Sequence, residues 1–277
     1  MAKRKTLIPT PKRSPRRSVL SDEIYEMIKA MIFEHKIAPG SRVNIDALAV
    51  ELEVSQTPVR EALARLESDG LIAKEPLKGY TATNLLSMEE FNDLFQFRLL
   101  IEPWAAEQAA TKIDSTGKAA LKGEMQRAKA AVKFKKDDQF QALTEHDARF
   151  HTLIAHISGS HSVATAFERT HCHLHLFRLF MANKLHLIES GSRTEFVKEL
   201  FEQYYHSGSG QLAIKEHDAI AKAILDQSPK VARIAMHSHI ESSLKRFAPS
   251  VKEGIVDIVR TNVSWRAGPT APITFNH

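Results

Sequence analysis

The sequence predicts a mainly α-helical protein with two domains, a small N-terminal module that includes a β-hairpin and a C-terminal all-α bundle of six to seven helices. Three observations support this fold class. Residues 21–83 contain three short helical patterns followed by a hairpin pattern. After residue 87, apolar residues recur at helical spacing, without an alternating strand pattern of useful length. A chain of 277 residues is also long enough for about two domains.

The first two helices of the N-terminal module are short. Apolar residues at helical spacing predict a helix over residues 21–37, and Ala38–Gly40 should end it. A second helix can begin at Asn44 or at Asp46, since either side chain is a suitable N-cap. Residues 1–19, which precede this module, form a separate basic segment.

The third helix is the most informative part of the chain. Ser55 can cap it, Pro58 falls in its first turn, where a missing N–H costs little, and Gly70 suits a left-handed C-cap. Its inward stripe consists of Val59, Ala62, Leu63 and Leu66. Residues 72–75 and 80–83 then flank a tight turn. This order is that of a winged helix-turn-helix, which places a helix in the DNA major groove.

The polar side of the third helix can be read in two ways. Gln56, Thr57 and Arg60 lie opposite the apolar stripe, where a merely solvated helix face is one interpretation. The helix-turn-helix context favours DNA contact instead.

The net charge of +5 is unevenly distributed. Residues 1–20 carry seven Lys or Arg and no acid, whereas residues 21–83 carry 11 acids and seven Lys or Arg, a balance of −4. We therefore expect residues 1–19 to form a basic disordered arm, either a solubility tail or an arm that tracks phosphates. The predicted DNA-reading module, residues 20–83, lacks the usual basic footprint of nucleic-acid binding.

The second domain is expected to span residues 88–247 after a linker at 84–87. Ser87 and Glu90 form a capping box that opens a long first helix. Residues 248–277 lack sustained periodicity and are expected to form a loosely ordered tail. Further helices are predicted near residues 116–135, 138–158, 161–187, 194–205, 211–226 and 229–247.

The composition excludes several classes of protein. The single cysteine, Cys172, cannot form an intrachain disulfide and is consistent with a reducing compartment. No apolar run approaches the ~18 residues of a membrane helix, and no secretory signal is recognisable. We therefore expect a cytoplasmic protein.

Four residues of the helical domain could hold a metal. Asp147 and His151 are spaced i and i+4 on one helix, at the border of its apolar face. His217 and His239 occupy similar borders of the last two helices. One carboxylate and three imidazoles suit Zn²⁺, Ni²⁺ or Mn²⁺. The alternative is an ordinary surface hydrogen bond between Asp147 and His151.

Other titratable residues are harder to interpret. We interpret His171, His173 and His175 as solvated or cavity-lining residues, with His173 on a different helix face from the other two. Arg98 lies among apolar neighbours and could extend outward to solvent or grip a carboxylate with its planar fork. Arg98 and Arg149 are our candidates for contact with an acidic effector.

The N-terminal module closely resembles the winged helix of GntR-type transcriptional regulators. The resemblance is carried by Pro39-Gly40, by Leu48-Ala49, by the run Val54–Leu63, and by Gly70-Leu71 and Lys78-Gly79. It implies a bacterial homodimer that binds an operator palindrome in double-stranded DNA. The positions that match DNA-reading residues are Ser55, Gln56, Thr57, Arg60, Lys78 and Gly79.

The helical domain resembles the FadR-like effector domain called FCD. The matching pieces are Arg98–Glu102, Asp147-x-x-x-His151, Glu216-His217 and Met236-x-x-His239. In metal-binding members, a carboxylate and three histidines hold a metal beneath a small organic acid. The resemblance implies that Asp147, His151, His217 and His239 do so here.

Three features depart from the family pattern. Gln56 stands where many relatives carry Arg, and Asp46 stands where others carry a basic residue. The segment 189–211 is longer than the usual connection.

The sequence thus predicts a transcriptional regulator that is controlled by an effector and acts as a repressor. It does not predict an enzyme. A metal-dependent enzyme is the first alternative, but no general base or nucleophile with its own signature is evident. A dimeric DNA-binding protein with a purely structural metal is the second alternative.

Overall fold

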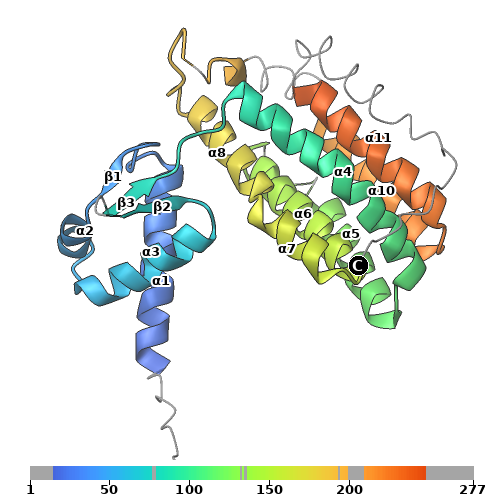
Figure 1. Ribbon diagram of the computed structural model, residues 1–277, viewed down its shortest axis with the longest axis horizontal. Helices are drawn as coiled ribbons and strands as arrows, with labels where there is room; N and C mark the ends of the chain where they lie inside the picture. Colours follow the sequence, from blue (N-terminus) through green and yellow to red (C-terminus); the bar gives the residue numbers. More distant parts are fainter. Residues whose placement is uncertain are drawn as a thin grey trace, which may run out of the picture.

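The computed structural model describes residues 15–76, 79–131, 133, 136–192, 194–198 and 209–247. It contains an N-terminal domain with a small sheet and a C-terminal helical domain, joined by an extended segment (Figure 1). The predicted fold class is confirmed. No helix in these ranges is long and apolar enough to span a membrane.

The N-terminal domain is a winged helix-turn-helix. Its elements are α1 (Pro15–Phe33), β1 (Arg42–Val43), α2 (Ile45–Glu51), α3 (Gln56–Ser68), β2 (Ile72–Glu75) and β3 (Gly79–Ala82). The antiparallel strands follow the order β1-β3-β2, with Lys74 opposite Tyr80. Ile28 of α1 packs in one core with Val59 and Leu63 of α3, and all three side chains are fully buried. The apolar stripe of the third helix therefore faces inward as predicted.

Helix α1 differs from the prediction at both ends. It begins at Pro15, so residues 15–19 belong to a helix and not to the predicted disordered arm, whose residues 1–14 lie outside the described ranges. It ends at Phe33 and not at residue 37, because His35 adopts a left-handed φ of 55°. The Ile37 N–H then donates to Met31 O over 3.1 Å, which closes the helix end.

Asn44 is the residue that caps α2. Its side-chain oxygen accepts from the backbone N–H groups of Asp46 and Ala47 at 2.8 and 3.2 Å. Asp46 therefore lies in the first turn, with its own carboxylate free to face α3.

The helical domain contains α4 (Met88–Lys112), α5 (Ser115–Ala131), α6 (Lys136–Ile157), α7 (His161–Arg169), α8 (Cys172–Lys184), α10 (Ser209–Leu225) and α11 (Pro229–Phe247). The capping box of α4 is present, since Ser87 and Glu90 bond each other's backbone N–H groups. Phe91, Phe150, Leu179 and Met236 contribute to a core shared by α4, α6, α8 and α11.

Two predicted helices of this domain differ from the structure or extend beyond its described part. The helix expected over residues 161–187 is wrong, because His171 adopts a left-handed φ of 47° and divides the segment into α7 and α8. Of the helix expected over 194–205, only residues up to 198 fall within the described part, and the tail at 248–277 lies outside it.

Helix α8 lies on the side of the bundle that faces the N-terminal domain (Figure 1). Leu174 packs against the N-terminal core, and the Phe177 ring meets the Phe33 ring edge-on at 5.1 Å between centroids. Arg178, only 1% exposed, donates to Thr83 Oγ1 over 2.7 Å and to Asn84 O over 3.2 Å. One helix of the bundle thus contacts both the winged helix and the segment that joins the domains.

Candidate metal centre and DNA-reading helix

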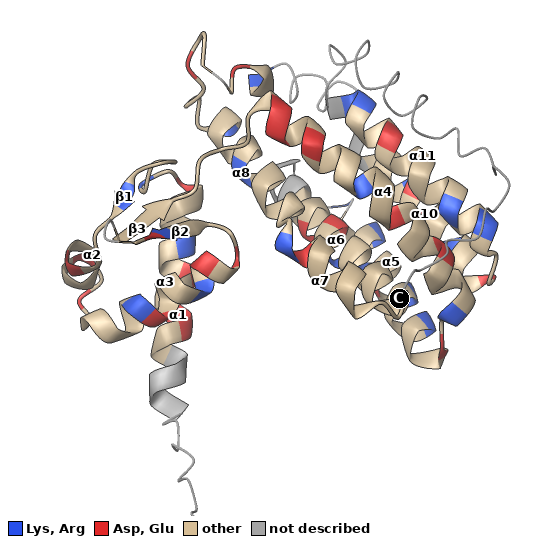
Figure 2. Cartoon of the chain, viewed as in Figure 1, with Lys and Arg blue, Asp and Glu red and all other residues tan. Residues whose placement is uncertain are grey.

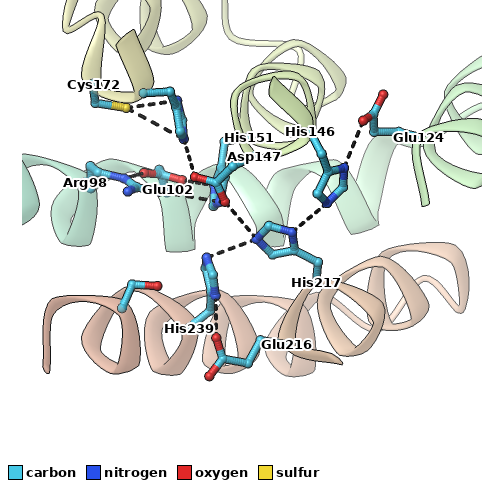
Figure 3. A network of polar contacts seen from close by, with 12 residues as sticks. Arg98, Glu102, Glu124, His146, Asp147, His151, Cys172, Glu216, His217 and His239 are labelled. Atoms are coloured by element: carbon cyan, nitrogen blue, oxygen red, sulfur yellow. Dashed lines mark hydrogen bonds and ion pairs between the residues drawn. The ribbon is translucent and has the colours of Figure 1, made fainter. Parts of the chain in front are cut away.

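The four predicted metal ligands lie together inside the helical domain (Figure 3). Asp147 and His151 project from α6, His217 from α10 and His239 from α11. One ligand atom from each lies within 4.8 Å of the others, and the three histidines are buried. The spacing i and i+4 on α6 brings the first two together, and the packing of α10 on α11 supplies the other two.

Each of the three imidazoles is held through its Nδ1 atom by a partner outside this group. His151 Nδ1 makes a short hydrogen bond to Glu102 on α4, and His239 Nδ1 donates to Glu216 over 2.8 Å. His217 is held through a relay, because its Nδ1 lies 2.9 Å from Nε2 of His146.

The relay ends on a carboxylate, which fixes its direction. His146 Nδ1 lies 2.9 Å from Glu124 Oε1, and a carboxylate only accepts hydrogen bonds. Burial lowers the pKa of His146, so its ring is neutral near pH 7 and its Nε2 accepts from His217 Nδ1. The hydrogen-bond network thus assigns the proton of His217 to Nδ1 and leaves its Nε2 with a lone pair.

His239 is held in the same tautomer as His217. Burial lowers the pKa of both His217 and His239, so both rings are neutral near pH 7. His239 donates from Nδ1 to Glu216, and its Nε2 is unprotonated. The two Nε2 atoms nevertheless face each other at 3.1 Å. Two lone pairs at this distance repel unless a cation lies between them.

Asp147 completes the ligand set with negative charge. Its Oδ1 lies 3.3 Å from His217 Nε2 and 3.6 Å from His151 Nε2. Burial raises its pKa, but the surrounding histidines outweigh this effect and hold the pKa well below its usual range. Burial likewise lowers the pKa of His151, yet the Glu102 and Asp147 carboxylates raise it overall. The carboxylates of Asp147 and Glu102 therefore stabilise positive charge at the point where the ligand atoms meet.

The separations suit a metal ion. Metal–ligand bonds of about 2.0–2.2 Å at tetrahedral to octahedral angles place neighbouring ligand atoms about 3.0–3.5 Å apart. The observed distances of 3.1, 3.3 and 3.6 Å are close to this range. Nitrogen and carboxylate ligands of this kind suit Zn²⁺, Ni²⁺ or Mn²⁺.

His173, which was predicted to be solvated or to line a cavity, also contacts this cluster. Its Nε2 lies 2.8 Å from Asp147 Oδ2, and its Nδ1 lies 3.1 Å from the Cys172 thiol. Burial lowers the pKa of His173, but Cys172 and Asp147 outweigh this effect and raise it to about 10. His173 also lines a cavity of about 520 Å³ between α1, α6 and α8. The position of His173 depends on the left-handed residue His171, which ends α7 and precedes α8. This break between the two helices has no local sequence signal.

The two arginines proposed for the effector lie in different surroundings. Arg98 is buried, donates from Nε to Glu102 over 2.5 Å, and has Nη2 3.4 Å from His151 Nε2. The side chain of Arg149 is 45% exposed and donates to Glu124 over 3.1 Å. Arg98 therefore lies beside the metal ligands, whereas Arg149 lies behind the His146 relay.

The polar face of α3 is exposed, as DNA contact requires. Gln56, Thr57 and Arg60 are exposed along α3, and Ser55 is its N-cap residue, although its hydroxyl makes no capping bond. Gly79 is exposed with a φ of 90°, and Lys78 lies outside the described residues. Both acidic and basic residues lie along the elements of this domain in the view of Figure 2.

Comparison with known proteins identifies both domains. Residues 20–81 match the gntR family of bacterial regulatory proteins, and residues 93–242 match the FCD domain. The chain belongs to the GntR family and carries an FCD domain. The two matches confirm the resemblance that was seen in the sequence of this GntR/FCD regulator.

Individual relatives of the regulator are distant. YdhC of Bacillus subtilis, an uncharacterised HTH-type transcriptional regulator, is 25% identical over 181 residues, or 65% of this chain and 79% of that protein. RspR of Escherichia coli, an HTH-type transcriptional repressor, is 30% identical over 139 residues, or 50% of this chain and 59% of that protein.

Solved structures agree on the fold. McbR/YncC of E. coli superimposes with a TM-score of 0.54 at 18% identity, covering 84% of this chain and 99% of that one. At this identity the likeness shows the fold alone. The relatives and neighbours are transcriptional regulators and not enzymes, which confirms that prediction.

Proposed function

We propose that this regulator binds an operator as a homodimer and that a small organic acid, bound beside a divalent metal, controls its operator affinity. The observation that carries the proposal is the meeting of three buried imidazoles, through their Nε2 atoms, with the Asp147 carboxylate. His217 and His239 offer lone pairs there without a donor between them. Bound Zn²⁺, Ni²⁺ or Mn²⁺ would supply a Lewis acid for a ligand oxygen.

Arg98 supports the choice of an acidic effector. Its guanidinium lies beside His151 and offers planar N–H groups, which suit a carboxylate. The contact between Arg149 and Glu124 favours a different role for Arg149, which is to hold the relay to His217.

Operator binding is supported by the exposed polar face of α3. In an isologous dimer, two such helices would enter the major groove about one turn (~34 Å) apart. Ser55 and Thr57 would fix the register, Arg60 would read a base edge, and the hairpin residues Lys78 and Gly79 would contact DNA beside it. The name of RspR, a repressor, supports repression as the mode of action.

An exposed apolar surface supports the homodimer. Leu100 and Trp104 on α4, and Val231 and Ile234 on α11, are exposed large apolar side chains on two helices that pack together. Arg233 of α11 bonds Glu107 of α4 over 3.0 Å and ties the two helices. We propose this α4–α11 surface as the contact with a second copy of the chain.

Metal analysis tests the ligand set directly. The protein is purified without added chelator, and its metal content is measured for the wild type and for His151→Ala, His217→Ala and His239→Ala. His237→Ala is the matched control, since His237 lies on α11 near His239 but is 40% exposed. We expect one metal per chain in the wild type and control and a loss in the three variants. Full metal retention by all three would exclude this site.

A thermal-shift screen tests the effector. Ligands that bind the folded state raise the melting temperature by mass action. Sugar acids, hydroxy acids, dicarboxylates and fatty acyl compounds are compared on the metal-loaded protein, followed by operator binding with each positive compound. A purely structural metal predicts that no acid raises the melting temperature or changes operator affinity.

A further inference from the structure

The DNA-reading surface carries a chain of three hydrogen-bonded side chains. Asp46 of α2 accepts a short hydrogen bond from Gln56 Nε2 at the start of α3. Arg60 Nη2, one turn further along α3, donates to Gln56 Oε1 over 3.1 Å. All three side chains are exposed.

The direction of these bonds fixes the Gln56 amide. A carboxylate can only accept hydrogen bonds, and a guanidinium can only donate them. The amide nitrogen of Gln56 therefore faces Asp46, and its amide oxygen faces Arg60. A flipped amide would lose both hydrogen bonds. Asp46 and Arg60 therefore select the same amide orientation from opposite ends.

This orientation decides which bases the helix can read. Bidentate recognition of adenine needs the oxygen and the nitrogen of a glutamine directed at one base. Here the two ends of the Gln56 amide are bonded to Asp46 and Arg60. Arg60 uses one of its five N–H donors and keeps the others for the O6 and N7 acceptors of guanine.

We propose that Asp46 is a positioning residue for sequence reading, which holds Gln56 and, through it, orients Arg60 toward a guanine in each operator half-site. The inference rests on the proposed operator binding. It gives a role to an acid on a DNA-facing surface, where a carboxylate by itself only opposes phosphate binding.

The test compares base discrimination and not total affinity. An operator is selected from random duplexes with the full-length wild type, and the guanine that Arg60 requires is identified as the base whose preference Arg60→Ala loses. Dissociation constants are then measured for this operator and for a version with the guanine replaced. The proteins compared are the wild type, Asp46→Ala, Asp46→Asn, Gln56→Ala and Glu51→Gln.

The variants separate the hydrogen bond from the charge. The amide oxygen of Asp46→Asn can still accept from Gln56, although the negative charge is gone. Glu51→Gln removes a charge from the other end of α2. Affinity for random duplex should rise similarly in Asp46→Ala, Asp46→Asn and Glu51→Gln, because each removes one negative charge near phosphates.

We expect Asp46→Ala and Gln56→Ala to lose about five- to tenfold of the guanine discrimination. Asp46→Asn and Glu51→Gln should keep it. Full discrimination by Asp46→Ala or by Gln56→Ala would overturn the positioning role. An equal loss in Asp46→Asn and Asp46→Ala would also overturn it, because the charge alone would then act. A wild type without any sequence preference would instead defeat the proposed operator binding.

Discussion

His173 Nε2 lies 2.8 Å from Asp147 Oδ2, so a residue of α8 contacts the carboxylate that also faces the three metal-site histidines. Five residues further along α8, Arg178 donates to Thr83 and Asn84 of the segment between the domains. A change in the position of Asp147 can therefore reach the winged helix through one rigid helix.

The first prediction concerns this link. We expect His173→Gln to keep its metal but to reduce the effect of an acidic effector on operator affinity, which for typical couplings is about 1–3 kcal/mol. The reason is that Gln cannot carry the positive charge that Asp147 favours on His173. Operator dissociation constants with and without effector, at fixed metal, measure the effect. An unchanged ratio of the two constants would refute the link.

The second prediction concerns Arg178, whose buried guanidinium bonds to backbone and hydroxyl oxygens. Burial lowers its pKa to about 10, and its hydrogen bonds go to Thr83 and Asn84. Arg178→Ala should lower the free energy of unfolding by about 2–4 kcal/mol, because two carbonyl groups lose their donors. Urea unfolding measures this. Arg169→Ala, on the exposed end of α7, should change it by less than about 0.5 kcal/mol.

The third prediction concerns the pH dependence of stability. Burial, followed by the charge of Arg178, lowers the pKa of His175 from 6.5 to about 4. The unfolded chain therefore binds this proton more readily, and stability is lost as the pH falls from about 6.5 toward 4, by at most about 3 kcal/mol. Above pH 6.5 the effect is absent.

His175→Gln removes this titration. The free energy of unfolding of His175→Gln, measured by urea at several pH values, should fall less steeply below pH 6.5 than that of the wild type. His161→Gln, at the exposed start of α7, serves as the control and should keep the wild-type slope. Identical slopes for wild type and His175→Gln would contradict the assignment.

The sequence was sufficient for features that depend on local spacing. The period of 3.6 residues placed Asp147 and His151 on one helix face, and the cap at Ser87 marked the start of α4. The same period placed His217 and His239 at the inward borders of the last two helices. That these two residues join Asp147 and His151 depends on helix packing, and it was predicted from the resemblance to the FCD domain.

Other features depend on tertiary packing and could not be predicted. The carboxylates that hold the imidazoles, such as Glu102 for His151, come from helices whose register is set by the core. The contact of His173 with Asp147 requires the left-handed residue His171, a conformation that histidine rarely adopts. The bond between Asp46 and Gln56 crosses a turn, so a single helix pattern cannot show it.

The last prediction tests the α4–α11 surface. Leu100 is 78% exposed and Ile234 is 65% exposed, so a charge at either position is tolerated by the folded monomer. In an isologous dimer each substitution occurs twice, and a desolvated carboxylate at such a contact costs several kcal/mol. Leu100→Asp and Ile234→Asp should therefore shift the protein from dimer to monomer in sedimentation velocity. Leu212→Asp, an exposed position on α10, should leave the dimer unchanged. Dimers of wild-type strength in both α4–α11 variants would exclude this surface, and the two half-sites of an operator would have to be bound through another contact.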